Sequence, residues 1–454
     1  MIPITFADWV AWTGAEPEAV DLDATIQGVT IDSRAVGPKD LFVALPGQRT
    51  HGHVYVSDVW AKGATALVES TFADHGGPRL VVPSPLTAMA AVVRRLVDDR
   101  RITVVGVTGS VGKTSIKELI GAVLATRFVV GVTQGNYNTA IGIPLSFFSG
   151  PAGMTHFVAE MGMRFSGEIL RLTEMAPPEI AVISNIGPSH LETLGSLDAI
   201  QAAKGEILRG LKPGGTAVLN FDDPRVRYLG GSLKDVKVLW YGETQGLDAT
   251  VESSQLAGDH TLIRLKWEGQ RYEIRLPWLG THQAMNAAAA FLVGIRLGIA
   301  PERVVQGLEA VASDRSRIRR KRLGTVEIIE DDYNASPVSM QAALAFLAEQ
   351  PGRRVAVLGD ILELGPDEEK LHRQVGIKVA GSADLLVTVG QRAEFIGEEA
   401  RLRELPTYPA ESVDEAYPLL QSLVRPGDVI LVKASHMMGL DRLVARMEEW
   451  GGPQ

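Results

Sequence analysis

A lysine and a threonine stand where a glycine-rich turn leads into a helix. The segment runs from an apolar strand through the turn into an amphipathic helix and reads Ile102-Thr-Val-Val-Gly-Val-Thr-Gly-Ser-Val-Gly-Lys-Thr-Ser115. Backbone N–H groups in such a turn point at phosphate oxygens, and the helix N-terminus adds partial positive charge. We therefore expect Lys113 to bridge the β- and γ-phosphates of a nucleotide and the Thr114 hydroxyl to hold Mg²⁺. The alternative is a tight glycine turn with an exposed lysine.

The turn differs from the eight-residue phosphate-loop pattern. That pattern needs a glycine at 107, where the chain has Val107, and the glycines fall at 106, 109 and 112, so the loop is one residue longer. The order strand, loop, helix still favours phosphate binding over a plain turn. The residues expected to surround the phosphates are Gly109, Ser110, Val111, Gly112, Lys113, Thr114 and Ser115.

Three further polar residues follow predicted strands, where an open parallel sheet binds its ligands. Glu160 ends the apolar run His156–Glu160, and its carboxylate is a suitable Mg²⁺ ligand. His190 lies in the loop after the run 180–184, and Lys204 lies on the helix that follows. Each has a plain alternative, as a solvated acid, a surface histidine or a helix-surface charge. Their joint placement beside a phosphate loop favours the functional interpretation.

Two other polar segments are candidates for binding. Thr133-Gln-Gly-Asn-Tyr-Asn138 is a polar loop before an apolar run, and its alternative is an ordinary turn. The basic run Arg315-Ser-Arg-Ile-Arg-Arg-Lys-Arg322 has the charge of a nucleic-acid patch, but the net charge of the chain is −9 and no aromatic residue interrupts the run. We expect a solvated linker that carries one or two phosphate-binding arginines, and no nucleic-acid partner.

More than one core is needed to position these residues. At roughly 100–200 residues per domain, 454 residues predict three domains, which we place at residues 1–99, 100–313 and 314–454. Strands and helices alternate through the last two, which indicates parallel α/β sheets. The expected fold class is α/β, with a smaller N-terminal α/β domain, a central phosphate-loop parallel sheet covered by helices on both faces, and a C-terminal Rossmann-like domain.

Short apolar runs and a glycine turn predict the individual elements. A hairpin is expected around Glu268-Gly269 within residues 250–276, and helices at 86–97 and 284–297. The expected strands are 41–45, 66–68, 102–107, 157–160, 180–184, 326–330, 355–359, 385–389 and 429–432.

Composition excludes several classes of protein. The hydrophobic fraction of 45% and the charged fraction of 22% are those of a globular chain, not a disordered one. With no cysteine, the chain has no disulfide, thiolate metal site or cysteine nucleophile. No run approaches the ~20 apolar residues of a membrane span, and the N-terminus has no signal-peptide pattern. We expect a cytoplasmic protein without a membrane span.

These residues also resemble a known family. The altered loop Val107-Thr-Gly-Ser-Val-Gly-Lys-Thr114 is similar to that of the Mur ligases and the folylpolyglutamate synthases. Two motifs of the last domain, Asp331–Pro337 and Leu358–Gly365, resemble the branch of Mur ligases that adds a dipeptide, although Ser336 and the pair Arg164-Phe165 depart from the family pattern. The other motifs that carry the resemblance are Asp32-Ser-Arg34, Gly52-His53, Gly135-Asn-Tyr-Asn138, Glu160-Met-Gly162, Asn185-Ile-Gly187, His190-Leu-Glu192, Ala203-Lys-Gly-Glu206, and His282 with Asn286.

The resemblance implies an ATP-dependent, ADP-forming amide ligase of peptidoglycan precursor synthesis that uses ATP and Mg²⁺. Its substrates would be UDP-N-acetylmuramoyl-tripeptide and D-alanyl-D-alanine, joined through an acyl phosphate. The implied catalytic residues are Lys113, His190, Arg317 and a carbamylated Lys204, and the implied metal ligands are Thr114, Glu160, His190 and Lys204. The implied nucleotide contacts outside the loop are His282, Asn286, Arg317, Asp331 and Asn334, and the implied substrate contacts are Asp32, Ser33, Arg34, Thr50, Asn136 and Asn138.

Three alternatives stay open at this stage. Arg315 is the alternative to Arg317 as the arginine between the second and third domains. A sibling ligase that adds another amino acid would share the ATP site. A phosphate-loop ATPase that drives a conformational change or partner binding would need no amine acceptor. We expect a monomer, and the third amino acid of the tripeptide is left open.

Overall fold

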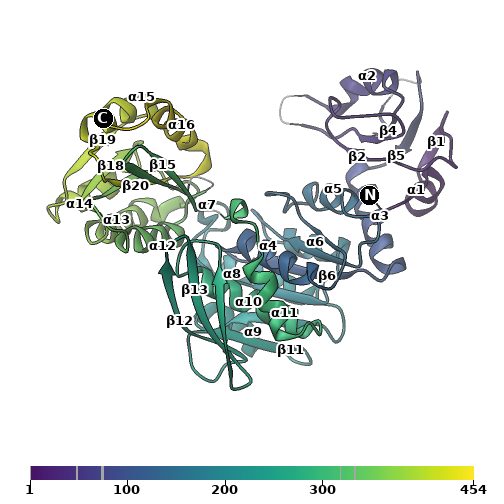
Figure 1. Ribbon diagram of the computed structural model, residues 1–454. Helices are drawn as coiled ribbons and strands as arrows, with labels where there is room; N and C mark the ends of the chain where they lie inside the picture. Colours follow the sequence, from purple (N-terminus) through teal and green to yellow (C-terminus); the bar gives the residue numbers. More distant parts are fainter. Residues whose placement is uncertain (1, 48–49, 73–75, 317, 332–333, 454) are drawn as a thin grey trace.

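The chain folds into three α/β parts, each built on its own sheet (Figure 1). The computed structural model describes residues 2–47, 50–72, 76–316, 318–331 and 334–453. In Figure 1 the purple first part and the yellow last part stand apart from each other, on either side of the larger central part. The expected fold class is confirmed.

The first part is a five-stranded sheet in the order β1-β5-β4-β3-β2, in which β1 pairs antiparallel and the others pair in parallel. Its last helix, α3 (Pro85–Asp99), begins at the N-cap Ser84 and packs against two helices of the central part. The other elements are α1 (Phe6–Thr13), β1 (Glu16–Glu18), β2 (Val29–Thr30), β3 (Leu41–Val43), η1 (Gly52–Tyr55), α2 (Val56–Ala61), β4 (Thr65–Glu69) and β5 (Arg79–Val82).

The central part is a nine-stranded mixed sheet in the order β14-β13-β12-β11-β10-β9-β6-β8-β7. Neighbouring strands from β7 to β12 in this order pair in parallel. β12, β13 and β14 pair antiparallel, and the β13–β14 pair is the predicted hairpin at Glu268-Gly269. The strands are β6 (Thr103–Thr108), β7 (Val130–Val132), β8 (His156–Glu160), β9 (Ile180–Ile183), β10 (Thr216–Asn220), β11 (Lys237–Gly242), β12 (Ala249–Ala257), β13 (His260–Trp267) and β14 (Gln270–Leu276).

Helices cover both faces of the central sheet. Successive residues of β6 belong to different cores, because strand side chains alternate between faces. Val105 packs in the core under α4, α10 and α11, whereas Val104 packs in the core that includes α6 and α8. The helices are α4 (Lys113–Ala125), α5 (Gly142–Phe148), α6 (Glu168–Met175), α7 (Leu191–Leu194), α8 (Leu197–Arg209), α9 (Pro224–Gly231), α10 (Gln283–Arg296) and α11 (Pro301–Glu309).

The last part is a six-stranded sheet in the order β15-β16-β20-β17-β18-β19, parallel except for β15. Among the helices of the described residues, none is long and apolar enough to cross a membrane. The elements are η2 (Ser313–Arg315), β15 (Arg319–Leu323), β16 (Val326–Glu330), α12 (Pro337–Ala348), β17 (Arg354–Gly359), η3 (Gly365–Asp367), α13 (Glu368–Ala380), β18 (Leu385–Val389), α14 (Glu394–Arg401), β19 (Thr407–Ala410), α15 (Val413–Leu423), β20 (Val429–Lys433), η4 (His436–Met438) and α16 (Leu440–Trp450).

The basic run predicted to be a solvated linker is partly a strand, so that prediction was wrong. Residues 319–323 form β15, which pairs antiparallel with β16. Lys321 Nζ lies 3.2 Å from a Glu330 carboxylate oxygen and 2.7 Å from one of Glu448. The basic side chains therefore pair with acids of the neighbouring elements, and their charge on an edge strand opposes edge-to-edge association.

Candidate functional site

The glycine turn is built into the edge of the central sheet. β6 ends at Thr108, and α4 begins at Lys113 after the turn. A Cβ at Gly109, where φ is +150°, would lie 1.9 Å from Ser184 Oγ, and a Cβ at Gly112, where φ is +87°, would lie 2.8 Å from Asn286 Oδ1. Both positions therefore favour glycine, because the backbone approaches Ser184, which follows β9, and Asn286 of α10 more closely than a Cβ allows.

Neighbouring loop residues hold this turn in shape. Ser110 N donates to Asn185 O at 2.9 Å, and Val111 N donates to Asn185 Oδ1 at 2.9 Å. Gly187 N donates to Ser110 Oγ at 2.9 Å. The backbone N–H groups of Ser110 and Val111, which the sequence predicted to bind phosphate, thus hold the loop against the end of β9. The positive end of α4 remains the feature of the loop that favours an anion.

Two hard oxygens meet at the start of α4. Thr114 Oγ1 donates to Glu160 Oε2 at 2.8 Å, and Asn138 Nδ2 donates to Glu160 Oε1 at 2.9 Å. Glu160 is 2% exposed at the carboxyl end of β8, next to β6. A buried carboxylate and a hydroxyl beside a phosphate loop fit Mg²⁺, which uses one or two protein oxygens and completes its shell with phosphates and water. The described residues hold no cluster of three or more His, Cys, Asp or Glu suited to a metal.

Lys113 and Lys204 share one carbonyl of the loop. Lys113 Nζ donates to Gly109 O at 2.8 Å, and Lys204 Nζ donates to the same oxygen at 2.9 Å from α8. Lys204 is 2% exposed. Burial, and then the charge of Lys113, lower the pKa of Lys204 well below its ordinary value of 10.5. Lys204 is therefore a deeply placed amine that gives up its proton easily, unlike a helix-surface charge.

His190 lies between the central and last parts. Its backbone is left-handed, with φ of +57°, and it precedes α7. Its Nδ1 lies 2.6 Å from an oxygen of Glu363, which belongs to the loop after β17. Burial lowers the pKa of His190, the charges of Lys204 and Lys113 lower it further, and Glu363 opposes them. The preceding residue bonds the phosphate loop, with Ser189 Oγ donating to Ser110 Oγ at 3.1 Å, so His190 lies beside that loop.

A second group of polar residues lies where α10 faces the last part. Asn286 Nδ2 donates to Gln283 Oε1 at 2.8 Å, and burial lowers the pKa of His282, against the charge of Asp331. Lys433, 1% exposed at the end of β20, lies 2.8 Å from an Asp331 oxygen. Asp331 and Lys433 of the last part thus contact each other, and the charges of both act on His282 at the start of α10.

Lys433 also donates to Asn334 O at 3.0 Å, so it contacts two of the predicted nucleotide residues, Asp331 and Asn334. Sequence analysis gave Lys433 no role. A lysine that ends the apolar run 429–433 was an available signal, because strand ends of this kind face the ligand edge of a parallel sheet. Glu363 was part of a quoted motif, but nothing in its position along the chain indicated contact with His190.

Other predicted residues lie elsewhere or outside the described part of the chain. Arg317 lies outside the described residues, and its alternative Arg315 donates to Glu118 of α4 at 2.7 Å. Asn136 is exposed, whereas Asn138 contacts Glu160. The predicted sugar-nucleotide contacts Asp32, Ser33, Arg34 and Thr50 are all in the first part of the chain.

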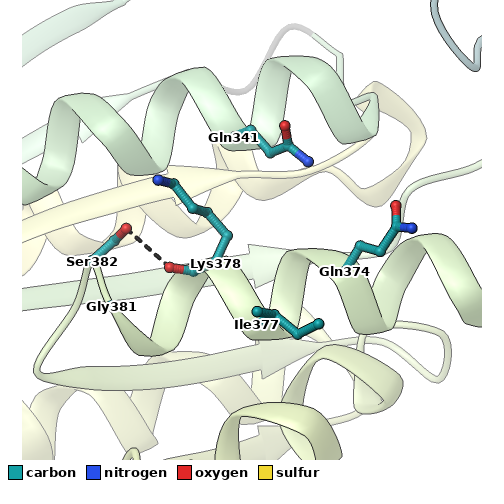
Figure 2. Close-up of a pocket in the computed structure, with 6 residues that line it drawn as sticks. All are labelled: Gln341, Gln374, Ile377, Lys378, Gly381 and Ser382. Carbon is teal, nitrogen blue, oxygen red and sulfur yellow. Dashed lines mark hydrogen bonds between the residues drawn. The ribbon is translucent and has the colours of Figure 1, made fainter.

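Hollows of the last part lie outside the predicted site. Figure 2 shows one of about 480 Å³ between α12 and α13, and none of its lining residues is a predicted site residue. The residues that line it are Gln341, Gln374, Ile377, Lys378, Gly381 and Ser382. Gln341 comes from α12 and three of the others from α13, while Gly381 and Ser382 follow α13, so the hollow belongs to the last part of the chain.

A phosphate loop, a buried metal-suited carboxylate and contacts from a third α/β part define a nucleotide-dependent enzyme of the three-domain ligase type. The family comparisons agree along the chain. Models described as "Mur ligase family, catalytic domain", "Mur ligase middle domain" and "Mur ligase, glutamate ligase domain" match residues 25–105, 107–294 and 314–436. The chain belongs to the Mur ligase family.

Relatives and solved structures of one kind match nearly the whole chain. The UDP-N-acetylmuramoyl-tripeptide–D-alanyl-D-alanine ligase of Bacillus subtilis is 34% identical, with 98% of this chain and 97% of that protein covered. The ligase of the same name from Escherichia coli is 32% identical over 99% and 100%. Acinetobacter baumannii MurF has a TM-score of 0.90 at 29% identity over 98% and 99%, and Thermotoga maritima MurF with ADP has 0.81 at 28% over 93% and 97%.

Proposed function

We propose that this protein is the ligase that joins D-alanyl-D-alanine to UDP-N-acetylmuramoyl-tripeptide, with ATP hydrolysed to ADP and phosphate. The observation that carries the ATP-dependent chemistry is the cluster of Lys113, Thr114, Glu160 and Lys204 around one glycine turn. The choice of substrates is supported by the relatives of that name, which match along the full chain. A sibling ligase would be expected to match best with relatives of another name.

The proposed reaction has two steps. The free carboxylate of the tripeptide attacks the γ-phosphorus of ATP, the bond to the bridging oxygen breaks, and ADP leaves. The amine of the dipeptide then attacks the carbonyl carbon of the acyl phosphate, loses a proton, and phosphate leaves as the amide forms. Activation is needed because a carboxylate is a poor acyl donor at neutral pH.

The chain's own residues serve this chemistry through charge and position. Lys113 offsets charge on the β- and γ-phosphates. Thr114 and Glu160 would hold Mg²⁺, which offsets phosphate charge and orients the transferred group. Lys204, as a carbamate, and His190 would serve a second ion. Residues Asp331 and Asn334 of the last part close over the nucleotide and exclude water from the acyl phosphate; we assign Arg317 to the same role.

Each of the three parts has its own proposed role. We divide the chain into residues 1–99, which bind the sugar nucleotide through Asp32, Ser33, Arg34 and Thr50, residues 100–313, which bind ATP, and residues 314–454, which complete the site. Asn136 and Asn138 contact the tripeptide side, and His282 and Asn286 contact the nucleotide base. We propose a cytoplasmic monomer without a nucleic-acid partner.

The test is phosphate release with UDP-N-acetylmuramoyl-tripeptide while the amine acceptor is varied. We expect turnover with D-alanyl-D-alanine and poor turnover with single amino acids. Faster turnover with free L-lysine or diaminopimelate would favour a sibling ligase. Undiminished ATP hydrolysis without any acceptor would favour an ATPase.

A further inference from the structure

The loop after β17 joins the last part of the chain to the central part at one carboxylate. Glu363 in this loop has φ of +63°, a left-handed conformation that is sterically disfavoured for a residue with a Cβ. Such conformations persist where the surrounding structure holds them, and they are common at functional sites. Backbone preference alone favours glycine at this position, so the presence of a glutamate side chain needs a physical reason.

The side chain of Glu363 reaches two elements of the central part. One carboxylate oxygen lies 2.6 Å from His190 Nδ1, and the other lies 3.8 Å from the guanidinium of Arg164. The backbone of the same residue contributes too, since Glu363 O accepts from Glu192 N at 3.3 Å. The carboxylate thus contacts the segments that follow β8 and β9, at the edge that also carries Glu160 and the phosphate loop.

Close backbone packing fixes this contact. Gly365 has φ of +59°, and a Cβ there would lie 3.0 Å from Glu192 Cα. The two backbones therefore meet at a distance that leaves no room for a side chain at position 365. The loop after β17 thus packs directly against the backbone of α7.

The bond to Glu363 determines the state of the imidazole. A carboxylate that accepts from Nδ1–H selects that tautomer, fixes the ring plane and leaves Nε2 as the nitrogen with a lone pair. The residue before His190 contacts the phosphate loop, since Ser189 Oγ donates to Ser110 Oγ at 3.1 Å. A freely rotating imidazole would present either nitrogen to the phosphate side.

We propose that Glu363 is a positioning residue that fixes the tautomer and orientation of His190 when the last part of the chain docks on the central part. Catalysis is thereby coupled to docking through one hydrogen bond between the two parts. The inference goes beyond the proposed function, which gives Glu363 no role, and it rests on that function for the role of His190 and for the choice of assay.

The experiment uses Glu363→Gly, Glu363→Gln and the control Glu369→Gln in the full-length protein. Glycine removes the carboxylate and relieves the left-handed backbone, so the thermal midpoint should stay level or rise. At the same time kcat should fall about 10- to 100-fold, the usual effect of losing such a partner, with KM for ATP nearly unchanged. Glutamine keeps an oxygen acceptor for Nδ1–H and should restore most of kcat. Glu369 is exposed on α13, pairs with Arg373 within that helix, and should leave kcat unchanged.

A second readout needs no substrate. In protein labelled with ¹⁵N at histidine, the Nδ1–H tautomer of His190 should be seen in the wild type, assigned by its loss in His190→Asn, and should disappear in Glu363→Gly. An unchanged His190 signal together with wild-type kcat in Glu363→Gly would overturn the proposal. A lower thermal midpoint with a loss of kcat that glutamine does not restore would also overturn it, because it would show a purely structural role. If wild-type protein fails to turn over the dipeptide, the proposed function fails, and the histidine spectrum still decides on Glu363.

Discussion

Lys204 shows how surroundings change the chemistry of a single side chain. Its ammonium would have to remain charged while it is fully buried and close to Lys113. Burial and the charge of Lys113 both lower its pKa. A neutral amine reacts with CO₂, loses a proton and becomes a carbamate, which offers two oxygens to a hard cation. The geometry is thus compatible with the carbamate that the resemblance implied.

We expect Lys204→Ala to lower kcat at least about 100-fold, the scale on which loss of one group facing the reacting charge acts. Acetate or formate at high concentration should restore part of the activity by filling the vacated space. Lys204→Arg should stay inactive, since guanidinium is not carbamylated. Phosphate release measures all three. Substantial activity in the arginine variant, without carboxylate rescue of the alanine variant, would favour a plain cation.

His372 couples pH to the stability of the loop that carries Glu363. It is fully buried, its Nε2 accepts from Ile361 N at 3.1 Å, and burial lowers its pKa below the ordinary 6.5. At pH values between the lowered pKa and 6.5, the imidazole of His372 is protonated in the unfolded chain but not in the native state. Stability is therefore lost as the pH falls below about 6.5, by at most about 1.4 kcal/mol per pH unit from this group.

The measurement is urea unfolding of the wild type and His372→Gln at about pH 7.5 and about pH 5.5. Glutamine can make both hydrogen bonds of the imidazole but does not titrate. The variant should lose less stability on acidification than the wild type. Equal losses in the two proteins would show that His372 does not titrate in this range.

At the scale of the element, strand, turn and helix together make the phosphate loop. Lys113→Ala should abolish phosphate release because it removes the cation that we propose to offset charge on the transferred group. The bond to Gly109 O is worth about 1 kcal/mol, so the thermal midpoint should move by only about 2–4 °C. Turnover like that of the wild type would rule out the phosphate-loop assignment.

The shape of the same loop is tested by Gly109→Ala. The new Cβ would meet Ser184 Oγ at 1.9 Å, so the loop must move and nucleotide affinity should fall at least about tenfold. Gly153→Ala is the matched control, because a Cβ there meets no atom within 4 Å and φ is not positive. Titration with a fluorescent ATP analogue compares the two. Equal affinities would show that the turn does not contact nucleotide.

Several strands with both faces buried were predictable, although β10, which is also buried, was not predicted. β6, β8, β16 and β20 are mostly apolar runs with cores above and below them, and their prediction is confirmed. β15 and β19 were missed because they are edge strands: the first is basic, and the second contains Pro409 and exposed side chains. Nothing in their composition identifies them, since their pairing depends on the neighbour that the fold supplies.

At the scale of the whole molecule, we expect the first part to bind the sugar nucleotide and to leave ATP binding unaffected. Arg34 is 89% exposed and pairs with Asp32 at 2.8 Å, and that bond is the main reason why the pKa of Asp32 falls to about 2. Arg34→Ala should raise KM for the sugar nucleotide about tenfold, through loss of charge-assisted bonds to its phosphates, and leave KM for ATP unchanged. Steady-state kinetics with each substrate varied in turn measures both. A parallel rise in KM for ATP would contradict separate sites.

The sequence by itself determined the local chemistry of this protein. The phosphate loop is encoded within residues 102–115, because a strand, glycines at fixed places and a helix start are properties of consecutive residues. Tertiary structure decided which distant groups join that loop. Lys204 meets a carbonyl 95 positions away, and Glu363 meets a histidine 173 positions away. Such meetings depend on strand order and on the docking of one sheet's edge against another, which arise from packing across the whole chain and not from spacing along it.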